Sequence, residues 1–123
     1  MEKIDVIAAQ FKKAFTRLDA VLKKRKNEFI RDAAIQRFEF TFDISWKLLK
    51  VLLEERSGTV CNSPKSCFRE AYKEKWIEGE DFWMEITNMR NLVSHTYNEE
   101  TAELIYAKLP EILKYFKKLK KLI

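Results

Sequence analysis

Apolar residues recur every three or four positions along almost the whole chain, and this spacing is the strongest constraint on its fold. The first stretch follows the rhythm of a helix with one buried face, at Ile4, Ile7, Phe11, Phe15, Leu18 and Leu22. The 123 residues include only two glycines and two prolines, whereas a β fold needs many turn residues. The sequence therefore predicts an all-α protein, with residues 1–123 forming a single domain.

Helix start and stop signals divide the chain into an antiparallel up-and-down bundle of four to five helices. Ser63 and Pro64 are typical of a helix start, Ser57-Gly58 of a helix end, and Asn98 can cap a last helix. The expected helices cover about residues 2–24, 28–56, 64–76, 80–93 and 99–123. Pro110 lies inside the last one, where the apolar stripe continues in phase, so we expect a kink near Lys108 rather than a break.

The second helix carries two apolar stripes, which indicates burial on more than one side. One stripe contains Phe38, Phe42, Leu49 and Leu52, and the other contains Phe40, Ile44, Leu48 and Val51. We expect this central helix to be covered by neighbours within the chain and by a second copy, which gives a two-fold homodimer. Burial wholly inside its own bundle is nearly as consistent with the pattern.

The chain is basic, with a net charge of +5 and lysines crowded into its last ten residues. Such a surface attracts polyanions such as RNA, although a solvated lysine face of an amphipathic helix is the commoner explanation. The sequence has no glycine-rich phosphate loop, so ATP binding of the Walker kind is excluded and no cofactor is expected.

Cys61 and Cys67 are the only cysteines. The chain opens with charged residues instead of a signal peptide, and no apolar run approaches the roughly 18 residues of a membrane span. We therefore expect a cytoplasmic protein, not attached to a membrane, with both thiols reduced. One histidine and two cysteines lack the usual ligand spacing, so no metal site is expected.

The stretch from Arg90 to Tyr97 holds the only histidine, His95. An arginine can hold a phosphate through two hydrogen bonds, and a histidine exchanges a proton near neutral pH. Five positions on a continuous helix rotate by about 140°, so the two side chains converge only if the helix ends between them or both face one cleft. Poor helix formers predict an ending near Ser94. A structural reading also exists, in which His95 caps the helix and Arg90 forms a surface ion pair.

This stretch resembles the signature of the HEPN superfamily, an arginine, a polar residue, three further residues and a histidine. The added tyrosine matches its HepT-like branch, whose members are encoded beside a minimal nucleotidyltransferase and are often called nucleotidyltransferase substrate-binding proteins. Residues 35–47 and 63–71 are similar to the second and third helices of that branch. The resemblance covers most of the chain.

The resemblance implies a toxin of a toxin-antitoxin pair, a metal-independent endoribonuclease with a composite site at a dimer interface. His95 would then be the acid or base, Arg90 would bind the scissile phosphate, and Asn91 would orient either of them. A monomer offers one imidazole, whereas a two-fold dimer brings two to one site. In the HepT-like branch the tyrosine corresponding to Tyr97 accepts nucleotidyl groups from the partner transferase, which blocks the ribonuclease.

Two rival hypotheses remain open. The chain could be a non-catalytic subunit that presents a substrate or nucleotide to the transferase and uses Arg90 and His95 only to hold phosphate. It could also be a plain helical dimerisation module. The sequence identifies neither the RNA target nor the nucleotide that a partner would transfer.

Overall fold

The structure is a computed structural model that describes residues 2–123, and these residues form helices and no β-strand. The all-α prediction is confirmed. The elements are α1 (Lys3–Leu22), α2 (Glu28–Ser57), α3 (Pro64–Lys73), α4 (Glu80–His95), α5 (Glu99–Leu119) and a final 3-10 turn, η1 (Lys120–Leu122). No helix within the described range is both long enough and apolar enough to cross a membrane.

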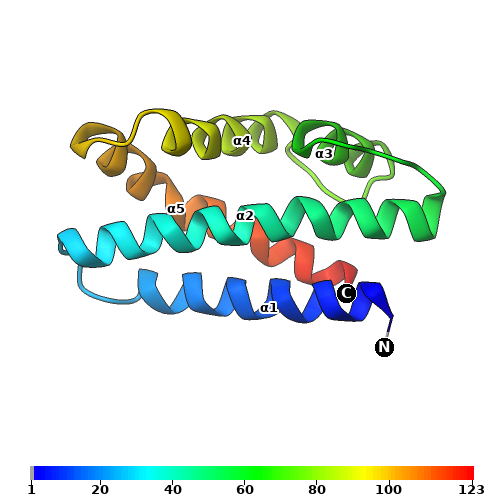
Figure 1. The fold of residues 1–123 in the computed structure, drawn as a ribbon, viewed down its shortest axis with the longest axis horizontal. Coiled ribbons are helices and arrows are strands. Elements are labelled where there is room, and N and C mark those ends of the chain that lie inside the picture. Colours follow the sequence, from blue (N-terminus) through cyan, green and yellow to red (C-terminus); the bar gives the residue numbers. More distant parts are fainter. Residues whose placement is uncertain (1) are drawn as a thin grey trace.

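Helix α2 is the centre of the bundle (Figure 1). It packs against α1, α3, α4 and α5. Helices α1 and α4 run antiparallel to α2 on opposite sides of it, and α3 lies end to end with α4 over the second half of α2. Helix α5 crosses behind α2 obliquely, from the end of α4 towards the start of α1. The start of α2, the end of α4 and the start of α5 therefore meet at one end of the molecule.

Local capping explains most helix ends. The Asn27 side chain accepts a hydrogen bond from the Ile30 amide at 2.8 Å, and Asn98 accepts one from the Thr101 amide at 2.9 Å. Ser63 caps α3 in the same way, with Pro64 in the first turn. At the other end of α2, Gly58 adopts a left-handed conformation that closes the helix. These residues act through their immediate neighbours, so they were recognisable in the sequence.

Helices α1 and α5 end earlier than predicted, at Leu22 and Leu119, and the ends of α3 and α4 differ as well. Helix α3 stops at Lys73 rather than near residue 76, because Lys75 takes a positive φ of 65°, which a helix does not accommodate. Helix α4 continues through His95, past the expected ending near Ser94. Helix α5 is one helix across Pro110, as predicted, and the kink near Lys108 stays a prediction.

A closed ring of aromatic side chains ties four helices together. Neighbouring ring centroids in this set are 4.5–6.4 Å apart, the range in which aromatic pairs attract. All five members are essentially inaccessible to solvent: Phe38 and Phe42 of α2, Phe68 of α3, Trp83 of α4 and Phe116 of α5. The ring thus joins residues of α2, α3, α4 and α5 in one core.

The two apolar stripes of α2 are buried mostly by the chain itself. Every member of the first stripe is buried, and so are Ile44, Leu48 and Val51 of the second. Phe40 is the exception, because 62% of its surface is exposed. The bundle therefore covers both stripes of α2 without a second copy, except at Phe40.

The prediction of two reduced thiols is wrong for this structure, in which Cys61 and Cys67 form a disulfide. Gly58 turns the chain at the end of α2 and Pro64 restarts it in α3, which brings the two α-carbons to 5.2 Å. That prediction rested on the expected compartment and ignored this geometry. The disulfide pins the α2–α3 connection against the buried side of α3.

Candidate functional site

Arg90 lies on α4 and is held by two carboxylates of α2. Its Nε and Nη2 donate to Asp43 at 3.3 and 3.2 Å, and its Nη1 lies 3.1 Å from Glu39 and also donates to Ser94. Glu39 and Asp43 are four residues apart, so both project from one face of α2. The guanidinium is therefore fixed in position, and each of its nitrogens already has a partner. A phosphate that binds Arg90 would have to displace Glu39 or Ser94, or approach from the exposed side.

His95 is the last residue of α4 and is exposed. Because α4 is continuous from Arg90 to His95, the two side chains leave the helix about 140° apart. The helix end at His95 agrees to within one residue with the ending predicted near Ser94, but it does not fall between the two residues, so this condition for convergence is not met. Within one chain, Arg90 contacts α2 whereas His95 is exposed.

Asn91 is exposed on α4 and precedes His95 by four positions. Residues four apart are neighbours on a helix surface, so Asn91 and His95 share one exposed face. The fold therefore separates the three predicted catalytic residues into two groups. Arg90 contacts the carboxylates of α2, and Asn91 and His95 lie on an exposed face of α4.

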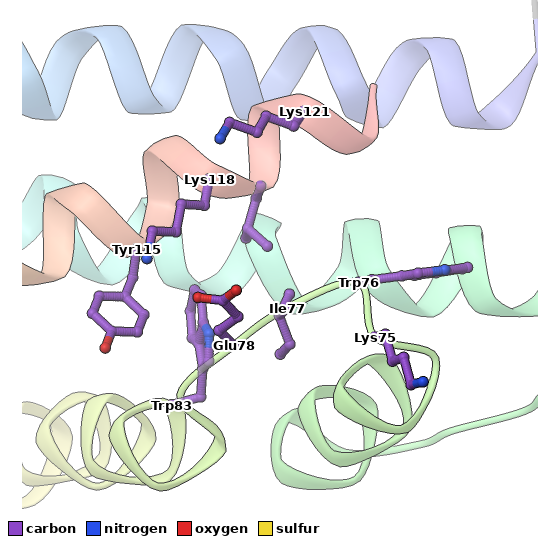
Figure 2. Close-up of a pocket in the computed structure, with 9 residues that line it drawn as sticks. Lys75, Trp76, Ile77, Glu78, Trp83, Tyr115, Lys118 and Lys121 are labelled. Atoms are coloured by element: carbon purple, nitrogen blue, oxygen red, sulfur yellow. The ribbon is translucent and has the colours of Figure 1, made fainter.

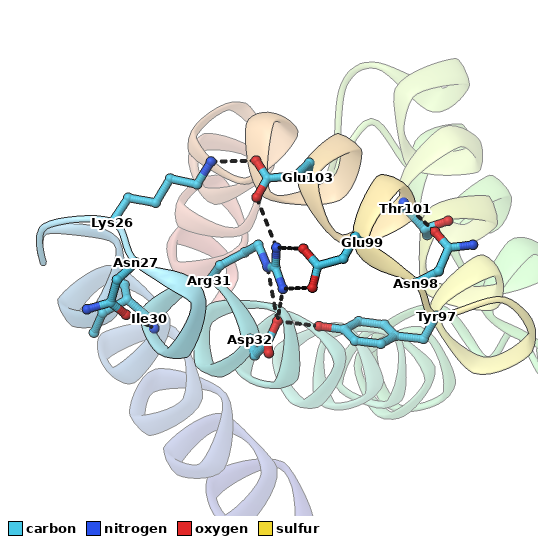
Figure 3. A network of polar contacts seen from close by, with 10 residues as sticks. All are labelled: Lys26, Asn27, Ile30, Arg31, Asp32, Tyr97, Asn98, Glu99, Thr101 and Glu103. Carbon is cyan, nitrogen blue, oxygen red and sulfur yellow. Dashed lines mark hydrogen bonds and ion pairs between the residues drawn. The ribbon is translucent and has the colours of Figure 1, made fainter.

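Tyr97 lies in the short connection between α4 and α5, and its side chain reaches back to α2 (Figure 3). Its hydroxyl donates a hydrogen bond of 2.7 Å to Asp32, a residue that sequence reasoning did not single out. Partial burial and the nearby Asp32 carboxylate raise the pKa of Tyr97 to about 12. In turn, the hydrogen bonds from Tyr97 and Arg31 lower the pKa of the Asp32 carboxyl. At neutral pH the pair is a phenol donating to a carboxylate.

Arg31 anchors Asp32 (Figure 3). Its Nε donates to Asp32 at 3.0 Å, and its Nη1 and Nη2 form a two-pronged contact with Glu99 of α5 at 2.6 and 3.0 Å. Nη1 also donates to Glu103 at 3.0 Å, and Glu103 pairs with Lys26. Arg31 is only 4% exposed, and its carboxylate partners raise its pKa further above its ordinary value. This network joins the start of α2 to the start of α5 beside Tyr97.

A shallow groove connects the Tyr97 and Arg90 clusters. It has a volume of about 340 Å³ and is lined by Asp32, Ile35, Gln36, Glu39, Val93 and Tyr97. Asp32, Gln36, Glu39 and Asp43 recur along one face of α2 at helical spacing. We call this the α2–α4 groove. Tyr97 lines this groove directly, and Arg90 is linked to it through Glu39, its ion-pair partner.

A second cavity lies at the other end of the bundle, between the α3–α4 connection and the end of α5 (Figure 2). Its volume is about 230 Å³, and Trp83, Tyr115, Lys118 and Lys121 are among its lining residues. It contains none of the residues indicated by the sequence motif. The α2–α4 groove is therefore the candidate functional site.

Sequence reasoning missed Arg31, Asp32, Glu39 and Asp43. One signal could have found three of them, because Asp32, Glu39 and Asp43 form a polar stripe along a helix that is otherwise rich in apolar residues. Their partners could not have been identified in the same way. Asp43 and Arg90 are 47 residues apart in the sequence, and Asp32 and Tyr97 are 65 apart.

Comparison with known proteins gives a consistent set of relatives. A family model described as nucleotidyltransferase substrate binding protein like matches residues 8–123. The probable ribonuclease HepT of Haemophilus influenzae is 33% identical over 84 residues, which is 65% of this chain and 58% of that protein. The aligned stretch thus spans less than two thirds of that relative.

Solved structures share the fold. A Thermus thermophilus protein superposes with a TM-score of 0.83 at 32% identity, covering 89% of this chain and 94% of that one. A tri-AMPylated HEPN toxin of Shewanella oneidensis, solved in complex with MNT antitoxin, superposes with a TM-score of 0.77 at 15% identity, covering 98% and 96%. A Haemophilus influenzae protein with the fold of a substrate binding domain of a nucleotidyltransferase gives 0.75 at 24% identity, with 98% of each chain covered. The last two likenesses establish the fold alone.

Proposed function

Because this chain belongs to the nucleotidyltransferase substrate binding protein like family, as the motif indicated, we propose that it is a HepT-like endoribonuclease toxin controlled through Tyr97. It cleaves RNA without a metal ion, as a two-fold homodimer. A minimal nucleotidyltransferase encoded nearby acts as its antitoxin by transferring a nucleotidyl group to the Tyr97 hydroxyl. The relatives named as a probable ribonuclease HepT and as a HEPN toxin bound to MNT antitoxin support this proposal.

The observation that carries the proposal is that Glu39, the ion-pair partner of Arg90, lines the same groove as Tyr97, with His95 exposed at the end of α4. Three groups thus lie close together along the chain: the Arg90 cation that binds phosphate, the Tyr97 hydroxyl that is modified and the His95 imidazole that transfers protons. Modification of Tyr97 would add a charged group to the groove that Glu39, the partner of Arg90, also lines, and this added group would block the nuclease.

The divergence of Arg90 and His95 on α4 supports a composite site between two copies. Acid-base cleavage needs two proton-transfer groups, and one chain holds one imidazole. A two-fold axis next to α4 supplies the second His95. The exposed Phe40 adds an apolar side chain that a second copy could cover, and it lines a cavity of about 470 Å³ between α1 and α2 together with Asp43, the residue that holds Arg90.

In this mechanism one His95 removes the proton of the ribose 2′-hydroxyl, and the His95 of the second copy protonates the leaving 5′-oxygen. Arg90 stabilises the extra negative charge on the phosphorane. Asn91, one turn before His95 on the same face, orients the imidazole. Glu39 and Asp43 hold the guanidinium until RNA displaces one of its contacts.

RNA cleavage in EDTA tests the nuclease. Replacement of His95 by alanine should lower the cleavage rate at least about 100-fold, the usual contribution of a general acid or base, while the oligomeric state stays unchanged. Asn88→Ala is the matched control, because Asn88 is another exposed polar residue of α4. Cleavage by pure His95→Ala protein at the wild-type rate would refute the assignment.

Nucleotidyl transfer is tested with the cognate transferase and ATP. Wild-type protein should gain AMP and lose ribonuclease activity, and Tyr97→Phe should do neither. Tyr72→Phe is the control, because Tyr72 is 46% exposed and Tyr97 is 48% exposed. Equal labelling of Tyr97→Phe and wild type would show that another residue is the acceptor.

The second candidate function is a non-catalytic subunit that holds a substrate or nucleotide for the transferase. Two observations favour this second function if the chain is a monomer. Glu39, Asp43 and Ser94 already occupy the Arg90 guanidinium, and His95 is not among its partners. A monomer in solution that fails to cut RNA but binds the transferase would select this function.

A further inference from the structure

The proposed mechanism of RNA cleavage does not use the hydrogen bond between Tyr97 and Asp32. This bond joins the α4–α5 connection to the first turns of α2. Both side chains are roughly half exposed, so a second protein can reach the Tyr97 hydroxyl without unfolding the bundle. The contact therefore combines an accessible hydroxyl with a carboxylate that already accepts its proton.

We propose that Asp32 is the catalytic base for the modification of Tyr97, and that Arg31 positions it. This inference rests on the proposed function, in which Tyr97 accepts a nucleotidyl group. It adds that the acceptor chain supplies part of the chemistry, with the partner transferase supplying the nucleoside triphosphate.

The reaction balances without a further reagent. The Tyr97 phenolic oxygen attacks the α-phosphorus of the nucleoside triphosphate and forms a new oxygen–phosphorus bond. The bond from that phosphorus to the bridging oxygen breaks, and pyrophosphate leaves. The phenolic proton passes to the Asp32 Oδ1, 2.7 Å away, and from there to solvent. Aspartates of protein kinases accept a substrate hydroxyl proton in the same way.

The surroundings of Tyr97 make a base necessary. Its partial burial, Asp32 and the charge of Glu39 raise its pKa, whereas Arg31 opposes this effect. Free phenolate is therefore scarce at neutral pH. Asp32 is already in place to take the proton while the new bond forms and the phenol becomes more acidic. Tyr97 therefore does not need to ionise first.

Arg31 gives Asp32 its orientation. Its Nε and Nη2 both lie 3.0 Å from the Asp32 Oδ1, the oxygen that accepts from Tyr97. Glu99 and Glu103 hold the buried guanidinium from α5. These contacts fix one rotamer of Asp32 and keep its carboxyl ionised, because they lower its pKa. Arg31 does not touch Tyr97 and so is a positioning residue.

Labelling by the cognate transferase and ATP tests the role of Asp32. Asp32→Asn keeps the shape of the side chain but removes its basicity, and should slow AMP transfer to Tyr97 about 100-fold. Asp19→Asn is the control, because Asp19 is an aspartate on α1 that contacts Lys23 and not the groove. Labelling of Asp32→Asn at the wild-type rate would overturn the inference while the proposed function stands.

The role of Arg31 is read from a pH profile. In Arg31→Met, Asp32 loses a cation that lowers its pKa, so the acid limb of the labelling rate should move to higher pH. A purely structural role would reduce the amount of folded protein without moving this limb. An unmoved limb in folded Arg31→Met protein would overturn the positioning role.

A titration of Tyr97 does not depend on the transferase. With ¹³C-labelled tyrosine and Tyr97→Phe for assignment, NMR should show that Asp32→Asn lowers the Tyr97 pKa from about 12 towards the ordinary value. An unchanged pKa would overturn the hydrogen bond itself. If the pKa falls but wild-type protein takes no label, Tyr97 is no acceptor, and the proposed function fails together with this inference.

Discussion

Two features require a glycine at position 79: the conformation of its backbone and the nearby side chain of Tyr115. Gly79 precedes α4 with a φ of 70°, a conformation that other residues rarely adopt. A β-carbon at this position would lie 2.7 Å from Cε2 of Tyr115. The Tyr115 ring cannot easily retreat, because its centroid lies 4.5 Å from that of Phe82 and 5.8 Å from that of Trp83. Gly58 has a similar φ of 65° but no atom within 4 Å of its ideal β-carbon.

Alanine at these two glycines should therefore have unequal effects on stability. Gly58→Ala carries only the left-handed backbone strain, about 1–2 kcal/mol. Gly79→Ala carries the same strain and an overpacked contact with Tyr115, which adds about 1–3 kcal/mol. Urea denaturation of both variants measures the difference. Equal losses would show that Tyr115 moves aside freely.

At the scale of elements, ionic contacts join α2 to α5 at the end of the molecule that holds Tyr97. Arg31 lies in the first turn of α2 and faces Glu99 and Glu103, which are one turn apart on α5. The Arg31 hydrogen bond lowers the pKa of Glu99, and Lys26 followed by Arg31 lowers that of Glu103. Both carboxyls are partly or largely exposed, so solvent and salt weaken these contacts.

The pH dependence of this junction follows from those pKa directions. A carboxyl whose pKa is lower in the folded state stabilises the fold above its unfolded pKa of about 4.5, and this effect is lost as the pH falls through the folded value. The difference in the free energy of unfolding between wild type and Arg31→Met should thus be larger at pH 7 and should approach zero near pH 3. Urea denaturation at both values measures it.

Arg37→Met is the control for this prediction. The Arg37 guanidinium donates to the backbone carbonyl of Arg17, at 2.8 Å, and a carbonyl does not titrate. Its stability difference from wild type should change little between pH 7 and pH 3. If the stability difference between Arg31→Met and wild type also stays constant between pH 7 and pH 3, the α2–α5 contacts contribute no stability.

For the molecule as a whole, the placement of two phenylalanines on α2 separates folding from assembly. Phe38 belongs to the buried aromatic ring and is 0% exposed, whereas Phe40 projects from the bundle. Phe40 also borders the cavity that contains Asp43, and therefore adjoins the Arg90 cluster. A homodimer that uses this surface would bury an apolar side chain that the monomer leaves in water.

Alanine at the two positions should affect different properties, folding stability for Phe38 and dimerisation for Phe40. Phe38→Ala should lower the free energy of unfolding by about 3–5 kcal/mol, as expected for a large core side chain. Phe40→Ala should change it by less than about 0.5 kcal/mol in the monomer, while weakening the dimer roughly tenfold or more. Thermal denaturation and sedimentation over a range of concentrations measure the two effects. A Phe40→Ala dimer as tight as wild type would place the interface elsewhere.

The sequence by itself determined the helices and most of the core. Caps and apolar periodicity act between residues less than two turns apart, so Asn27, Gly58, Ser63 and Asn98 were sufficient to mark helix ends. The same locality explains why the apolar stripe of α5 correctly indicated one helix across Pro110. The motif residues Arg90, Asn91, His95 and Tyr97 were also visible, since a motif is a matter of order along the chain.

Only the tertiary structure decided which side chains meet. Arg90 with Asp43, Tyr97 with Asp32, and Arg31 with Glu99 are pairs of residues from different helices or connections, and no periodicity along one helix encodes such a pairing. Whether α4 extends through His95 is a matter of one residue at a helix end, which propensities do not resolve. The disulfide likewise depended on how the α2–α3 connection folds back. Contacts between distant residues are set by the packing of the whole bundle, and that packing is a property of all its helices together.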